Sequence, residues 1–512
     1  MRSRWNDADA VREAAQANEA LLGERVYTSR LLGAERALVL HGGGNTSVKS
    51  HGLLYVKSSG SDLAGVKESD FSAVRLDQAL ALIQGPDLDN AALREAVTQA
   101  AARPGPGASI ETLMHALLPW PYVEHTHADA ILAVANTVNG TRIAGELFGE
   151  LAPLVPFHPS GFALAKACLE VYRTQASART IGLILLHHGV VAFGRSARES
   201  YENMLALVTR AEGYLATRGA WQLPVDPRPF SWNVARIARL RRDVSRAAGF
   251  PLLLAAQEGP AWQAFARRAD LEAMCAAGPA TPQHAVFLRA QAMAGTDIDA
   301  FEQRYGALVR AAHPAIEHEV AGFDFAPRVI VDPDLGAWVA AIDSAHLRMA
   351  AEILRQDLEI KSRASAHDCY EGLPADANID AEIHYGGQER RLRARGGPAT
   401  RLLGEAVLIG AGEGSEALGS AYARAGAAVV RDGSLGGSAL VRDTVRRFGG
   451  IDVLVLDTPD VALLDAAAPA LTQAPRGGRV VAAGFPASES GPLVRRCGAL
   501  GLTIEPALEA SA

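Results

Sequence analysis

The chain has 512 residues, of which 49% are hydrophobic and 21% are charged, and its formal net charge is -7. This length allows roughly three domains, and the composition is typical of a globular chain with large cores, which excludes disorder as the dominant state. The negative charge argues against nucleic acid or an anionic membrane as the main partner. The four cysteines are scattered, and no stretch reaches about eighteen uninterrupted apolar residues, so we expect a cytoplasmic protein without disulfides or membrane spans.

Strand-like apolar runs alternate with helical patterns up to about residue 225. The strand candidates are ALVLHG, LLYVKSSG, YVEHTHA, IGLILLHHG and VVAFG, and helical patterns cover residues 7–22 and 197–215. Polar residues gather where the strand-like runs end. Residues 1–225 are therefore predicted to form an α/β domain with its polar motifs at strand ends.

The rest of the chain divides into three further segments. Residues 226–370 are predicted to be a mainly helical extension with one strand candidate at 327–336. Residues 371–400 are polar and rich in Gly, Asp and Arg, which is typical of a linker or an exposed arm. Residues 401–512 contain a strand, AVLIGAG, followed by a helical pattern and further buried strand candidates. This last segment is predicted to be a small Rossmann-like domain with a parallel sheet.

A candidate metal site begins with His125 and His127 in an apolar strand-like run. Residues at i and i+2 of a strand project to the same face and can bind one metal ion. His188 follows another apolar run, where the end of a strand brings a ligand to the rim of the sheet. Three neutral imidazoles leave an open coordination position on zinc or another divalent ion. Each of these histidines alone is more readily explained as a polar group at a strand end, but the combination favours a catalytic metal site.

Glu111 lies upstream of the histidine pair, in the predicted first turn of a helix that Ser109 can cap. Acids are common at helix starts because of the helix dipole, but a carboxylate beside a metal can also move protons on a bound substrate. Two further motifs, HGGGNTS at 41–47 and KSSGSD at 57–62, supply backbone NH groups and hydroxyls suited to an anion. Together they favour a small phosphorylated substrate. His115, His158, His187 and His284 are interpreted as core or surface histidines that orient neighbours.

The motifs GGGNTSVK, YVKSSGSDL, SIETLMHALLP, VEHTHADAILAVAN and LLHHGVVAFGRSARESYENMLALVTRAE resemble successive blocks of the class II aldolase/adducin family. The likeness is greatest to its bifunctional rhamnulose-1-phosphate aldolase/alcohol dehydrogenase type. The resemblance implies an α/β/α aldolase domain in which His125, His127 and His188 bind zinc and Glu111 is the acid/base. It also implies phosphate contacts from Asn45, Ser58, Gly60 and Ser109, and a homo-oligomeric assembly.

The implied reaction is cleavage of a ketose 1-phosphate, similar to rhamnulose 1-phosphate, to dihydroxyacetone phosphate and a hydroxyaldehyde. A Schiff-base aldolase is the rival chemistry, but only Lys57 and Lys166 lie near apolar sequence in this domain. The same fold resembles sugar-phosphate epimerases, dehydratases and non-catalytic adducin-like proteins. The three histidines and Glu111 favour an enzyme over a binding protein.

The carboxyl-terminal segment resembles a shortened short-chain dehydrogenase domain. Gly410, Gly412 and Gly414 are candidates for the turn beneath a dinucleotide pyrophosphate. Such dehydrogenases use a tyrosine four residues before a lysine, whereas no lysine follows Lys361 and Tyr422 is the only tyrosine after Gly404. We therefore expect no dehydrogenase activity and weak or no binding of NAD. A bifunctional aldolase/dehydrogenase is the alternative.

Overall fold

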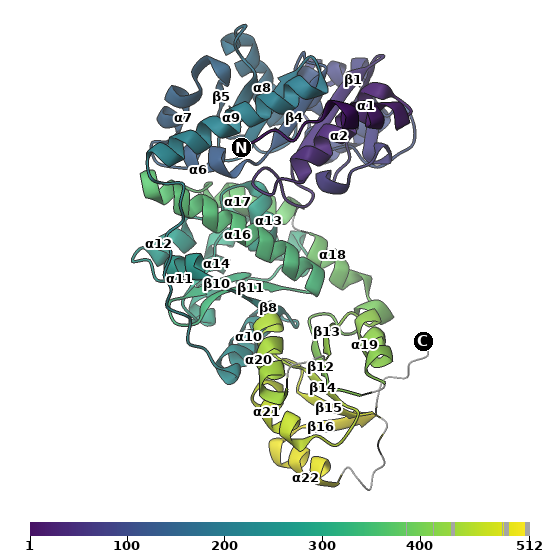
Figure 1. Cartoon of the computed structure of the whole chain (residues 1–512), viewed down its shortest axis with the longest axis vertical. Coiled ribbons are helices and arrows are strands. Elements are labelled where there is room, and N and C mark those ends of the chain that lie inside the picture. The colour runs from purple at the N-terminus through teal and green to yellow at the C-terminus, as the bar shows by residue number, and fades with distance from the viewer. Residues whose placement is uncertain (386, 413, 432–435, 484, 486–490, 507–512) are drawn as a thin grey trace. The chain divides into compact units, whose positions relative to one another are not determined.

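The structure is a computed structural model, and it describes residues 1–385, 387–412, 414–431, 436–483, 485 and 491–506. The chain divides into two compact units (Figure 1). The first comprises Met1–Leu223 and Gln356–Leu373, and the second comprises Pro224–Arg355 and Pro374–Ala512.

The first unit is built on a seven-stranded sheet with the order β3-β2-β1-β4-β7-β6-β5. Its neighbouring strands are antiparallel except for the parallel pair of β5 and β6. The strands are β1 (Asn45–Ser50), β2 (Leu53–Lys57), β3 (Phe71–Arg75), β4 (Tyr122–Thr126), β5 (Leu154–Val155), β6 (Gly182–Leu185) and β7 (Gly189–Gly194). The helices are α1 (Asp7–Gln16), α2 (Ala20–Gly33), α3 (Leu76–Ala81), α4 (Asn90–Gln99), α5 (Thr112–Leu117), α6 (Asp129–Ala135), α7 (Gly140–Phe148), α8 (Phe162–Gln175), α9 (Ala197–Thr217) and the end of α16 (Ser344–His367).

Helices cover both faces of this sheet, and the side chains of β4 are therefore buried on both faces. Tyr122 packs with residues of α2 and α9, whereas Val123 packs with residues of α5 and α8. Glu124 shares the face of Tyr122 and forms a fully buried ion pair with Arg25. Since strand side chains alternate, His125 projects to the face of Val123, where α5 begins. The α/β/α layering thus places the first predicted ligand beside Glu111.

The second unit contains two sheets. A four-stranded sheet has the order β8-β11-β10-β9, and a five-stranded sheet has the order β13-β12-β14-β15-β16. The first part of the unit consists of α10 (Val234–Ala248), β8 (Leu253–Gln257), α11 (Pro260–Ala266), α12 (Leu271–Ala276), α13 (Pro282–Leu288), β9 (Met293–Ala294), α14 (Ile298–Ala312), α15 (Ile316–Glu319), β10 (Val329–Asp332), β11 (Gly336–Ala341), α17 (Ala375–Tyr385) and α18 (Gln388–Arg395). The buried Arg241 of α10 pairs with Asp452 at 2.7 Å and ties the two parts of this unit together.

The five-stranded sheet is parallel throughout. Its strands and the helices that connect them are, in chain order, β12 (Ala406–Ile409), α19 (Ser415–Arg424), β13 (Ala428–Arg431), α20 (Gly437–Phe448), β14 (Val453–Leu456), α21 (Val461–Leu471), β15 (Arg479–Ala482), α22 (Gly491–Leu500) and β16 (Thr503–Pro506). The chain runs from β12 to β13 on one side and returns to β14 on the other. The direction of winding therefore reverses between β12 and β14, the position at which open α/β sheets bind ligands.

The structure differs from the sequence-based expectation in several segments, and β1, β3 and β5 were not among the strand candidates. The run ALVLHG forms buried turns rather than a strand, because the glycines that follow it make a loop. The predicted helical extension, 226–370, also carries the four-stranded sheet, whose strands LLAAQ and GAWVAA are alanine-rich and lack polar alternation. The predicted linker, 371–400, contains α17 and α18, and α17 buries Asn378, Ile379 and Glu382.

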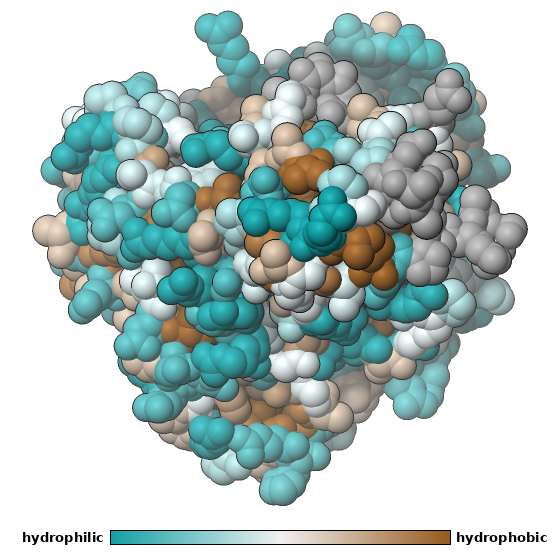
Figure 2. Space-filling model, turned by 90° about the horizontal axis from the view of Figure 1, so that it is seen from below, coloured by the Kyte–Doolittle hydropathy of each residue, from teal (hydrophilic) through white to brown (hydrophobic). Residues whose placement is uncertain are grey.

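The described surface is mostly hydrophilic where Figure 2 shows it, with small separated hydrophobic patches. In the part of the chain that the structure describes, no helix combines the length and the apolar character needed to cross a membrane.

Candidate active site

Three histidines of the first unit meet at the ends of β4 and β6. His125 is in β4, His127 directly follows this strand, and His188 is in the tight turn between β6 and β7. One ligand nitrogen from each residue lies within 4.8 Å of the others, and the Nε2 atoms of His125 and His127 are 3.1 Å apart. Nitrogens bound to one zinc ion are roughly 3.3 Å from one another. The donor set therefore fits a divalent ion of this kind.

Two glycines allow the backbone to close around this cluster. Gly44 has φ 59°, and a Cβ at this position would lie 2.7 Å from the carbonyl oxygen of His125. Gly189 has φ 154°, and its Cβ would lie 2.2 Å from the carbonyl oxygen of Thr126. A side chain at either position would collide with the strand that carries His125.

The ring of His125 is oriented by the backbone. Its Nδ1 atom lies 3.1 Å from the carbonyl oxygen of Val190, so Nδ1 carries the proton and donates, and Nε2 faces the other histidines with a lone pair. Burial lowers the pKa of His125 to about 4. The ring is therefore neutral at physiological pH, which is the form that binds metal.

Glu111 lies directly beside the histidines, at the residue before α5 begins. Its two carboxylate oxygens are 3.2 Å from Nε2 of His188 and 3.6 Å from Nε2 of His125. Burial raises the pKa of Glu111, but hydrogen bonds from His188 and Asn45 oppose this effect, and the pKa lies well below its usual value. Glu111 is therefore a carboxylate at neutral pH and starts as a proton acceptor.

Two neighbours complete the surroundings of the Glu111 carboxylate. Nδ2 of Asn45 donates to one oxygen at 2.7 Å, and the hydroxyl of Ser160 donates to the other at 3.0 Å. The register of the sheet explains the first contact, because Asn45 is paired with His125 across β1 and β4. Ser160 was missed from the sequence, since it lies in a loop before α8 that has no periodic pattern.

The predicted phosphate-contact residues also converge. Ser109 Oγ accepts from Asn45 Nδ2 at 3.2 Å and from the backbone NH of Glu111 at 3.2 Å. Ser58 forms an isolated β-bridge with Ala108, the residue before Ser109. Gly60 is exposed with φ 82°, and its Cα would lie 3.2 Å from a Cβ at Gly42. The two glycine-containing loops and the start of α5 are thus in contact.

Lys57, the candidate for Schiff-base chemistry, is used differently. Its ammonium group donates to the carbonyl oxygens of Gly42 and Gly44, each at 3.1 Å, and the side chain is buried. Lys166 pairs with Asp87 at 2.7 Å and is about half exposed. Lys57 therefore holds the glycine-rich loop in place.

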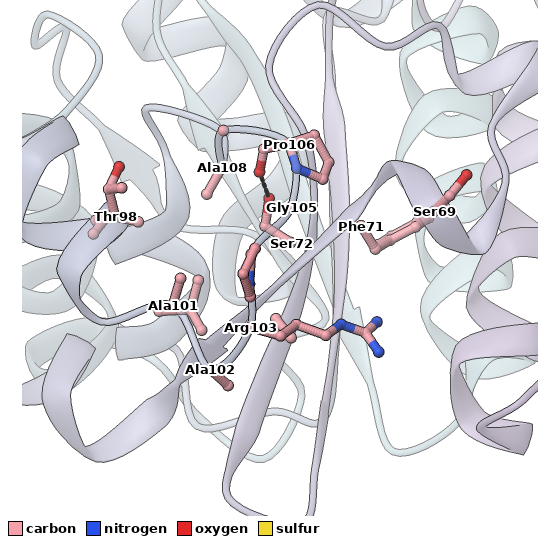
Figure 3. Close-up of a pocket in the computed structure, with 15 residues that line it drawn as sticks. Ser69, Phe71, Ser72, Thr98, Ala101, Ala102, Arg103, Gly105, Pro106 and Ala108 are labelled. Carbon is pink, nitrogen blue, oxygen red and sulfur yellow. Dashed lines mark hydrogen bonds between the residues drawn. The ribbon is translucent and has the colours of Figure 1, made fainter.

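A pocket of about 670 Å³ lies next to this region and is lined by β3, the end of α4 and residues 101–108 (Figure 3). Ser72 on its wall donates to the carbonyl oxygen of Pro106 at 2.5 Å and lies 3.3 Å from the hydroxyl of Ser58. The three histidines are not among its lining residues. The pocket is therefore a neighbour of the candidate site and not the site itself.

The glycine-rich turn of the second unit has a different environment. Gly410, Gly412 and Gly414 follow β12, and Asp457 follows β14, so they meet where the winding of the sheet reverses. A Cβ at Gly412 would lie 1.9 Å from a carboxylate oxygen of Asp457, and the NH of Gly414 donates to that oxygen at 3.2 Å. The carboxylate of Asp457 thus lies against the turn that is the candidate contact for a pyrophosphate. Asp432 follows the second strand candidate of this segment and is a candidate ribose contact from the sequence, but it lies outside the described residues.

Models of known protein families match two segments of this chain. Residues 24–215 match the class II aldolase and adducin N-terminal domain, and residues 233–385 match the second domain of class II aldolases. The uncharacterized oxidoreductase YuxG of Bacillus subtilis (strain 168) is 33% identical over 207 residues, which are 38% of this chain and 30% of that protein. The match therefore spans less than a third of the length of this relative.

Two solved structures resemble the chain over about two fifths of its length. The N-terminal class II aldolase domain of a conserved protein from Thermoplasma acidophilum is 33% identical, covers 42% of this chain and 99% of its own, and has a TM-score of 0.37. The L-fuculose-1-phosphate aldolase from Thermus thermophilus is 19% identical, covers 39% of this chain and 94% of its own, and has a TM-score of 0.28. With residues 24–215 and 233–385 matched to its two domains, the chain belongs to the class II aldolase/adducin family.

Proposed function

We propose that this protein is a metal-dependent class II aldolase that cleaves a ketose 1-phosphate to dihydroxyacetone phosphate and a hydroxyaldehyde. The observation that carries the proposal is the position of the Glu111 carboxylate, 3.2 Å from His188 and 3.6 Å from His125. A proton-transfer group therefore lies beside a donor set suited to a divalent ion, which is the combination that cleavage next to a carbonyl requires.

His125, His127 and His188 are the residues that would hold the ion, and three neutral imidazoles favour zinc among the common divalent metals. When bound, the ion acts as a Lewis acid that stabilises negative charge developing on substrate oxygens. The chain contributes the orientation of the ligands, which Val190 fixes for His125, and a buried site that excludes water.

Glu111 moves the proton at C3 of the dihydroxyacetone phosphate moiety. In the synthesis direction its carboxylate takes this proton, and the C4 oxygen takes up a proton once the bond to the aldehyde has formed. In the cleavage direction the carboxylate takes the C4 hydroxyl proton as the bond between C3 and C4 breaks and the aldehyde forms, and it then delivers a proton to C3. The low pKa of Glu111 supports the role of acceptor, because the group is ionised before substrate binds. Asn45 and Ser160 each donate to one of its oxygens and hold the carboxylate in one orientation.

The phosphate group is proposed to contact Ser58, Gly60 and Ser109, whereas the side chain of Asn45, the fourth candidate, is engaged by Glu111, Ser109 and His115. The contact between the loops that carry these residues supports this assignment. Lys57 contributes by donating to the carbonyl oxygens of Gly42 and Gly44, which fixes the course of this loop. A sugar similar to rhamnulose 1-phosphate is the proposed substrate, and a homo-oligomer is the proposed assembly.

The direct test is a panel of ketose 1-phosphates assayed for release of dihydroxyacetone phosphate, before and after treatment with a chelator. The proposal predicts release with at least one sugar, loss of release after chelation and recovery when zinc is returned. Conversion of the same sugars without dihydroxyacetone phosphate would instead identify an epimerase or dehydratase. Release that persists after complete removal of metal would contradict the proposal.

A further inference from the structure

His115 is a fully buried histidine that the proposed reaction does not use. It lies four residues after Glu111, so both side chains project from the same side of the chain at α5 toward β1. Its Nδ1 atom is 2.7 Å from the hydroxyl of Ser47, and its Nε2 atom forms a short hydrogen bond with Oδ1 of Asn45. Ser47 and Asn45 are two residues apart on β1 and share a face. The four side chains Ser47, His115, Asn45 and Glu111 therefore form one continuous series of hydrogen bonds.

The chemistry of the end groups fixes the direction of this series. Nδ2 of Asn45 donates to Glu111 Oε2 at 2.7 Å and to Ser109 Oγ at 3.2 Å, so the amide NH₂ faces Glu111. The amide oxygen of Asn45 then faces His115 and can only accept. Nε2 of His115 must therefore carry a proton and donate it to Asn45. Since burial lowers the pKa of His115 to about 3, the ring is neutral, and Nδ1 accepts from the hydroxyl of Ser47.

We propose that His115 is a positioning residue that keeps the Asn45 amide from turning over. In the observed orientation the two amide protons serve Glu111 Oε2 and Ser109 Oγ. A turned amide would place its oxygen against the Glu111 carboxylate, where two acceptors repel each other. His115 thereby holds Glu111 in its place beside His125 and His188 without contacting substrate. The inference rests on the proposed role of Glu111.

The first test compares two variants of His115. His115→Phe keeps a ring but removes the NH donor. This variant is expected to lower kcat by about 10- to 100-fold with a smaller change in KM, the size of effect that is typical when a residue that orients the groups around a metal site is replaced. His115→Gln returns an NH donor at the position of Nε2 and is expected to recover most of the loss. Bound zinc should be unchanged in both variants. His318→Phe, on the exposed surface, is the matched control and should behave as the unsubstituted protein.

A double-variant cycle separates positioning from a general effect on folding. If His115 acts only through Asn45, then His115→Phe in an Asn45→Ala background should change kcat by less than about twofold, because coupled residues are not additive. The same loss of kcat in both backgrounds would contradict the proposal. Unchanged kcat in the single variant His115→Phe would contradict it as well.

A measurement without turnover keeps this inference separate from the proposed function. Nitrogen NMR of protein labelled at histidine, with the His115 signals assigned by their absence in His115→Gln, reports which ring nitrogen carries the proton. We expect the neutral form protonated at Nε2, both with zinc bound and in metal-free protein. A proton on Nδ1 would overturn the inference, whereas failure to cleave any ketose 1-phosphate would overturn only the function on which it rests.

Discussion

The two units of this chain each place a carboxylate beside a group of polar atoms at strand ends, with opposite consequences. In the first unit, Glu111 lies beside three histidines whose nitrogen lone pairs can bind a cation, so its negative charge favours the binding of that cation. In the second unit, Asp457 lies against the glycine-rich turn and accepts a hydrogen bond from the NH of Gly414, so its negative charge opposes the binding of an anion there. The sequence of a histidine-rich or glycine-rich motif therefore indicates a binding site only together with the charge of the side chain that the fold places beside it.

The largest effect is expected from removing a histidine ligand. His188→Ala should lose bound zinc and aldolase activity together, because two remaining imidazoles bind an ion far more weakly than three. Elemental analysis and the dihydroxyacetone phosphate assay measure the two properties on one sample. Full zinc content in this variant would remove His188 from the ligand set and weaken the contrast between the two units.

A smaller but still large effect is expected from Glu111→Gln. This change keeps the shape of the side chain and its contact with Asn45 but removes the proton acceptor, so turnover should fall on the order of a hundredfold or more. Zinc content should stay at the level of the unsubstituted protein. Undiminished turnover would show that Glu111 is only an acid at the start of a helix, and the carboxylates of the two units would then be alike.

Acid should destabilise the first unit through His115. Its pKa is about 3 in the folded protein and about 6.5 in the unfolded chain, so between these pH values the unfolded chain binds the proton and the folded one does not. The contribution of His115 to the free energy of unfolding should therefore fall by about 1.4 kcal/mol per pH unit as the pH decreases from 6.5 toward 3. Denaturant titration of the metal-free protein measures this slope, and His115→Phe should make it shallower. An identical slope in that variant would show that His115 binds its proton equally in both states.

The smallest effect is expected in the second unit. NAD and NADP should bind weakly or not at all, because Asp457 repels a pyrophosphate at the turn formed by Gly410, Gly412 and Gly414. Asp457→Asn removes the charge and should raise the affinity, and calorimetric titration of both proteins measures it. Tight binding to the unsubstituted chain, or steady reduction of NAD with a hydroxyaldehyde, would restore the alternative of a bifunctional enzyme.

Much of the candidate site could be predicted from sequence because its spacing is local. His125 and His127 are separated by one residue of a strand, and Glu111 is at the start of a helix shortly before them. The hydrogen bonds from Asn45 and Ser160 to Glu111 depend instead on how β1 pairs with β4 and on a loop before α8. Neither feature produces a local sequence pattern that indicates these hydrogen bonds.

The same reason explains what was missed in the second unit. Its four-stranded sheet uses alanine-rich strands without polar alternation, which are indistinguishable from buried helix segments by periodicity. Asp457 reaches the glycine-rich turn only because β12 and β14 are neighbours in the sheet, although the two segments are far apart in sequence.

The central claim is that Glu111 and the three histidines act together on the proton at C3 of dihydroxyacetone phosphate. It is tested most directly by incubating the protein with dihydroxyacetone phosphate in heavy water and following the C3 proton signal by NMR, which requires no knowledge of the aldehyde. We predict that one of the two C3 protons exchanges in the presence of the zinc-loaded protein, that both persist after chelation, and that the exchange resumes when zinc is returned. Exchange that continues at the same rate in the chelated protein would contradict the account.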